Sequence, residues 1–126
     1  MRLKDNLYTV SDVQRDNSTT HFCITLNAAH VIYRAHFPAE PVTPGVCLVQ
    51  MAVELTEESL GQPLQLRKAV NVKFLSVISP LTTPCTRFTV TTAPAASDTV
   101  RATVLVECEE GVMAKMSLLL IPAASA

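Results

Sequence analysis

The segment Gly45–Leu60 most constrains the fold, because it predicts one long helix that is apolar on nearly all sides of its first half. Gly61 and Pro63, directly after it, are typical of a helix end, since glycine adopts the left-handed conformation and proline cannot continue the helix. A helix of this kind must be buried on most sides.

The segment before the helix, residues 36–44, predicts a stiff loop that begins with a histidine. Pro38, Pro41 and Pro44 each fix a backbone angle and remove a donor. The helix is expected to start at Gly45, where unpaired N–H groups and the positive end of the helix dipole are available. A histidine held on a rigid loop near such donors indicates an acid–base site.

The remaining chain reads mostly as strands. Alternating or apolar runs bounded by turn residues predict strands at 7–14, 20–26, 65–78, 85–92, 99–108 and 112–121. Val31–Ala35 is expected to be a short extended piece, and Gly111 to provide the positive φ of a hairpin turn. The pattern predicts an α+β protein with a single domain, residues 1–126.

A longer motif spans residues 36–46 and resembles the signature of the β-hydroxyacyl-acyl-carrier-protein dehydratases. Its positions in register are His36, Phe37, Pro38, Pro41, Val42, Pro44, Gly45 and Val46. The resemblance implies the hotdog fold, a curved antiparallel sheet wrapped around one central helix. It extends more weakly over most of the chain, including residues 70–74.

The resemblance also implies roles for individual residues. His36 would remove a proton next to the thioester carbonyl, and the N–H of Gly45 would stabilise the oxyanion. Phe37, Pro44 and Val46 would contact the acyl chain. The family works as a dimer on acyl chains that an acyl carrier protein holds through phosphopantetheine, with no metal or redox cofactor.

The sequence departs from the family at the catalytic acid. Gln50 occupies that position, and a neutral amide can donate a hydrogen bond but cannot deliver a proton. Glu54 lies one helical turn later, where the family usually has glutamine, on the same helix face and about 6 Å away. Either Glu54 replaces the missing acid, or it is a solvated or salt-bridged helix residue and the chemistry is lost.

Three functions remain open from the sequence. The first is a dehydratase acting on 3-hydroxyacyl thioesters in fatty-acid or polyene-type synthesis. The second is a catalytically degraded subunit that pairs with another hotdog chain, which would contribute the acid. The third is a hotdog acyl thioesterase, for which Glu54 is the available helix carboxylate.

Composition excludes several other classes. A net charge of −1 gives no electrostatic case for nucleic acid, and the longest apolar runs are too short or too polar to cross a membrane. The four cysteines form no C-x-x-C pair, so no zinc site is predicted, and Cys47 is expected to be a core residue. The N-terminus does not resemble a secretion signal, so a cytoplasmic location is expected. Six basic residues are candidates for an acidic carrier surface: Arg67, Lys68, Lys73, Arg87, Arg101 and Lys115.

Overall fold

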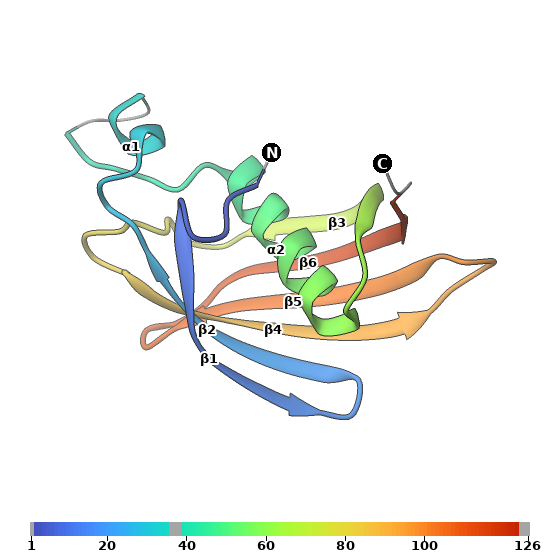
Figure 1. Cartoon of the computed structure of the whole chain (residues 1–126). Coiled ribbons are helices and arrows are strands. Elements are labelled where there is room, and N and C mark those ends of the chain that lie inside the picture. Colours follow the sequence, from blue (N-terminus) through green and yellow to red (C-terminus); the bar gives the residue numbers. More distant parts are fainter. Residues whose placement is uncertain (1, 36–38, 124–126) are drawn as a thin grey trace.

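A computed structural model describes residues 2–35 and 39–123, and it consists of one antiparallel sheet with a long helix across one face (Figure 1). The strand order is β1-β2-β4-β5-β6-β3, so β1 and β3 are the two edges. The bounds of the strands are β1 Tyr8–Asp16, β2 Thr19–Leu26, β3 Leu64–Phe74, β4 Cys85–Pro94, β5 Val100–Cys108 and β6 Gly111–Pro122. This is the hotdog fold that the motif predicted.

The central helix, α2, spans Gly45–Leu60, as the sequence predicted. Gly61 ends it with a φ of 67°, and its N–H donates to the carbonyl of Glu57 at 2.8 Å. The helix buries its apolar face against the sheet, where alternate strand residues form the other half of the core. The fully buried members of this core include Met51, Leu55, Phe22, Phe88, Val90, Val104, Leu118 and Leu120.

Two predictions of local structure were wrong. Val31–Ala35 forms a short helix, α1, instead of an extended piece. The cause is a local cap, because the Nδ1 atom of His30 accepts the N–H of Ile32 at 3.0 Å and the His30 carbonyl accepts the N–H of Tyr33 at 3.1 Å. This arrangement satisfies the first donors of the helix.

The strand predicted over 65–78 ends at Phe74. The N–H groups of Leu75 and Ser76 both donate to the carbonyl of Met113, so the regular ladder with β6 stops there. The chain then leaves the sheet, and the carbonyl of Ile78 accepts the N–H of Thr43 just before α2. Earlier in β3, the register against β6 shifts between Leu66 and Lys68 and again between Ala69 and Asn71.

Candidate functional site

The N-terminus of α2 is the first part of the candidate site. Pro44 is its N-cap residue with extended backbone angles, and no side chain of the described residues caps it. The carbonyl of Pro44 accepts the N–H groups of Cys47 and Leu48 at 3.0 and 3.2 Å. The first turn therefore presents its leading N–H groups, beginning with Gly45, to whatever lies in front of the helix.

Phe74 lies directly over this helix start. A Cβ atom added to Gly45 would lie 2.7 Å from the Cε2 and Cζ atoms of the Phe74 ring, closer than real Cβ contacts come. Glycine thus lets the end of β3 approach the helix. Together they border a pocket of about 320 Å³ that is lined by Val42, Thr43, Pro44, Gly45, Leu48, Phe74, Ser76, Val77 and Ile78. Sequence reasoning missed Phe74 as a site residue, because its contact with Gly45 is long-range.

The loop that carries the predicted base is tied at both ends. The hydroxyl groups of Tyr33 and Thr43 are 2.9 Å apart, and both residues are buried. His36 and Phe37 lie outside the described residues, so the structure gives no position for them. The bond between Tyr33 and Thr43 nevertheless fixes where the loop leaves α1 and where it enters α2.

Glu54 is buried, at 3% exposure, and its carboxylate accepts four hydrogen bonds. Its Oε2 atom accepts the N–H of Leu3 at 2.8 Å and the Nε2 of Gln50 at 2.9 Å. Its Oε1 atom accepts the N–H of Lys4 at 2.8 Å and the hydroxyl of Tyr8 at 3.0 Å. An ionised carboxylate has about four acceptor positions, so these donors match its capacity. Glu54 thereby fastens the N-terminal segment onto α2.

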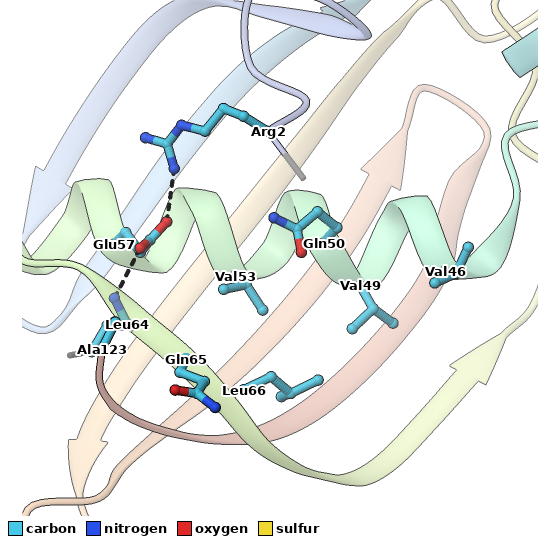
Figure 2. A pocket seen from close by; sticks show the side chains of 10 residues that line it. All are labelled: Arg2, Val46, Val49, Gln50, Val53, Glu57, Leu64, Gln65, Leu66 and Ala123. Atoms are coloured by element: carbon cyan, nitrogen blue, oxygen red, sulfur yellow. Dashed lines mark hydrogen bonds and ion pairs between the residues drawn. The ribbon is translucent and has the colours of Figure 1, made fainter. Parts of the chain in front are cut away.

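Gln50 lines a second pocket, of about 580 Å³, between α2 and the start of β3 (Figure 2). Val46, Val49 and Val53 lie along the same side of the helix and give this pocket an apolar wall. At its far end Glu57 accepts a hydrogen bond from the Leu64 N–H at 2.8 Å and pairs with Arg2 at 3.0 Å. The pocket is open, and Val46 at its rim is 70% exposed.

Burial shifts the pKa values of three groups near the helix. The pKa of Tyr8 is raised well above its usual value of 10.0, first by burial and then by the negative charge of Glu54. Burial also raises the pKa of Tyr33, and this effect exceeds that of the hydrogen bond with Thr43, which lowers the pKa. Burial raises the pKa of the Cys47 thiol, although the thiol lies in the first turn of the helix. Cys47 is a buried core residue, as expected.

The other polar candidates have local roles or are exposed. The Nδ1 atom of His21 lies 3.0 Å from the Thr89 hydroxyl across β2 and β4, and His30 caps α1. Within residues 2–35 and 39–123, no group of three or more His, Cys, Asp or Glu side chains could hold a metal ion. Over the same part of the chain, no helix has the length and apolarity to cross a membrane. All six candidate basic residues of the carrier surface are exposed.

Comparison with known structures defines the class of protein. The structure is similar to a chain of "The Dehydratase Heterocomplex ApeI:P" from Xenorhabdus doucetiae, with a TM-score of 0.70 and 14% identity over 89% of this chain and 96% of that one. It is also similar to the HP0420 homologue from Helicobacter felis, with a TM-score of 0.68 and 16% identity over 97% and 93% of the two chains. It is similar as well to a hypothetical thioesterase from Streptococcus pneumoniae, solved with coenzyme A. That comparison gives a TM-score of 0.63 and 11% identity over 94% of this chain and 87% of that one. At these identities the likeness establishes the hotdog fold.

The family follows from the sequence itself. The model of the ApeI-like family, described as ApeI dehydratase, matches residues 12–110. This chain therefore belongs to the ApeI-like dehydratase family. No curated protein matches the sequence.

Proposed function

We propose that this chain is one subunit of a heteromeric hotdog dehydratase that acts on 3-hydroxyacyl thioesters of an acyl carrier protein. The observation that carries the proposal is the hydrogen bonding of Glu54, whose carboxylate already accepts four bonds. With Gln50 at the acid position and Glu54 engaged in this way, we infer that the acid comes from a second, different chain.

In the proposed reaction His36 removes a proton from the carbon next to the thioester carbonyl. Negative charge moves to the carbonyl oxygen, where the Gly45 N–H stabilises it. The acid of the partner chain protonates the β-hydroxyl as the carbon–oxygen bond breaks, so that water leaves and a trans-2-enoyl thioester remains. The uncapped start of α2 supports the role of Gly45.

The pockets support an acyl thioester as the ligand. The larger one presents Val46, Val49, Val53 and Leu66 along its length, which suits an acyl chain. We propose that Phe37, Pro44 and Val46 contact this chain near the reacting carbon. Gln50, on the same wall, would hydrogen-bond to the substrate's polar end instead of giving a proton.

A heteromeric assembly fits what is known of a similar protein and of this sheet. The protein from X. doucetiae is a dehydratase heterocomplex. In the present chain both pockets lie beside β3, an edge strand that has β6 as its neighbour on one side only. A second hotdog chain against β3 would cover the pockets and bring its own helix to the site.

No observation favours the thioesterase alternative. That reaction would use a helix carboxylate to activate water or to attack the thioester. Glu54 was the candidate, and its two oxygen atoms are instead bound to Leu3, Lys4, Tyr8 and Gln50.

Mass spectrometry of a short 3-hydroxyacyl carrier thioester, incubated with the purified chain, tests the proposal. We expect no loss of water with this chain alone, and no release of the free acid. Dehydration by the chain alone would contradict the heteromeric assignment. If that activity disappeared in both His36→Ala and Glu54→Gln while the folded fraction stayed unchanged, Glu54 would be the acid.

A further inference from the structure

The free edge of β3 exposes backbone hydrogen-bonding groups and apolar side chains to solvent. Val70 on the strand is 44% exposed and Phe74 is 50% exposed, and Leu75 and Val77 after it are 54% and 62% exposed. An edge strand with such a surface is a ready template for pairing with another strand. This edge also borders the pocket at the start of α2.

The same edge carries only positive charge. Arg67, Lys68 and Lys73 lie on β3, and residues 59–97 contain neither aspartate nor glutamate. Lys68 and Lys73 pair in register with Leu119 and Lys115 of β6, so each stands on the sheet face away from α2. Lys73 therefore already faces one cation, Lys115, across the strand pair.

The carboxylate of Glu57, beside the start of β3, already has partners. It accepts the N–H of Leu64, the first residue of β3, and forms a salt bridge with Arg2. Arg67 donates to the hydroxyl of Thr99 at 3.3 Å, so Lys68 and Lys73 are the cations that a partner strand would meet.

Pairing of two identical copies through this edge brings like charges together. In an antiparallel pair related by a two-fold axis, the first half of one strand lies against the second half of the other. A two-fold axis that crosses the strand pair near residues 70 and 71, midway between Lys68 and Lys73, would place Lys68 of each copy against Lys73 of the other. Like charges across neighbouring strands are destabilising.

We propose that β3 selects a hotdog partner whose own edge strand carries carboxylates that meet Lys68 and Lys73. The proposal deepens the heteromeric assembly described above and rests on it for the identity of the partner as a hotdog chain. The exposed apolar residues form the contact with the partner, and the charges determine which chain pairs with β3. Self-pairing is disfavoured for the same reason.

The chain itself can provide the acidic probe. Lys68→Glu/Lys73→Glu places two carboxylates on the β3 edge, at two exposed positions. Wild-type protein, mass-labelled and mixed with this variant, is analysed by native mass spectrometry at low salt. We expect mixed dimers to exceed random pairing at least about threefold, and the excess to shrink at about 0.5 M salt because the charges are screened.

A matched charge reversal away from the edge is the control. Arg101→Glu changes an exposed cation of β5, a strand that β6 separates from β3. This variant should pair with the wild type at random. Random pairing of the edge variant as well, or the absence of mixed dimers at any salt concentration, would overturn the proposal. The readout needs no substrate, so a failure of the dehydratase assignment would leave it unaffected, and the reverse also holds.

Discussion

At the scale of single residues, Glu54 is a buried carboxylate that fastens the N-terminal segment to α2. Its carboxylate joins two N–H groups of the N-terminal segment, the Tyr8 hydroxyl and the Gln50 amide. Buried charged groups are stable only when hydrogen bonds replace water, and here four do so. The possibility that Glu54 supplies the proton stays a prediction, but its contacts favour a structural carboxylate.

Replacing this carboxylate should destabilise the protein. Glu54→Gln keeps the size of the side chain but turns one acceptor into a donor that faces existing donors. We expect the free energy of unfolding to fall by about 2–4 kcal/mol, measured by urea denaturation. Tyr8→Phe, which removes only one of the four donors, should cost about 1 kcal/mol. An unchanged stability of Glu54→Gln would contradict the structural role.

The raised pKa values of Tyr8 and Cys47 predict a loss of stability at alkaline pH. In the unfolded chain the two groups ionise near their usual pKa values of 10.0 and 9.0, whereas the raised pKa values in the folded protein keep them protonated to higher pH. Their contribution is therefore complete below pH 9 and declines as the pH rises above it. Thermal unfolding between about pH 8 and pH 11 measures this decline, which should be smaller in Tyr8→Phe. Equal declines in both proteins would contradict the assignment to Tyr8.

At the scale of elements, the site is arranged by contacts that flank α2. The bond between Tyr33 and Thr43 ties α1 to the residues before α2, and Phe74 packs over Gly45, the first residue of α2. Of these four residues, Gly45 alone was a site candidate from the sequence. Together the two contacts position the Gly45 N–H beside the pocket and hold Thr43, just before α2, against α1.

Loss of the bond between Tyr33 and Thr43 should loosen the loop. Tyr33→Phe and Thr43→Val each remove one hydroxyl from a buried pair, so each should lower the free energy of unfolding by about 1 kcal/mol. Hydrogen exchange should also become faster at the Thr43 N–H, which donates to Ile78. The double variant should lose less free energy of unfolding than the two single variants lose together, because both substitutions remove the same hydrogen bond. Strict additivity would show that the two hydroxyls do not stabilise one another.

Substitution of Gly45 tests the approach of Phe74. In Gly45→Ala the new Cβ overlaps the aromatic ring, which is half exposed and can move aside. We expect the free energy of unfolding to fall by about 1 kcal/mol in the wild-type background. In the Phe74→Ala background the same change should be neutral or stabilising, because alanine favours the helix. Equal effects in the two backgrounds would contradict the contact.

Local sequence signals account for the part of the structure that could be predicted. Proline and glycine set both ends of α2, so its bounds were predicted correctly. The end of β3 and the short helix α1 were not, because they depend on the Met113 carbonyl and on the His30 side chain. The partners of Glu54, apart from Gln50, come from the distant N-terminal segment, residues 3–8. No spacing rule along the helix could have revealed them.

At the scale of the whole molecule, we propose that one chain leaves the site incomplete. The two pockets flank the same helix and open beside the same free edge of the sheet. We infer that this chain brings a histidine loop and a helix N-terminus, while its partner brings the acid. The positive edge strand would keep the two roles on different chains, because it disfavours pairs of identical copies.

Complementation between two variants of this chain tests that division of roles most directly. One copy is the wild type, with His36 and Gln50, and the other is His36→Ala/Gln50→Glu with Lys68→Glu and Lys73→Glu to promote pairing. Loss of water from a short 3-hydroxyacyl carrier thioester is followed by mass spectrometry for each copy alone and for the mixture. We expect dehydration in the mixture only, where His36 of the wild-type copy meets the carboxylate that Gln50→Glu introduces in the other. Dehydration by the wild type alone, or an inactive mixture whose mixed dimers are confirmed, would contradict it.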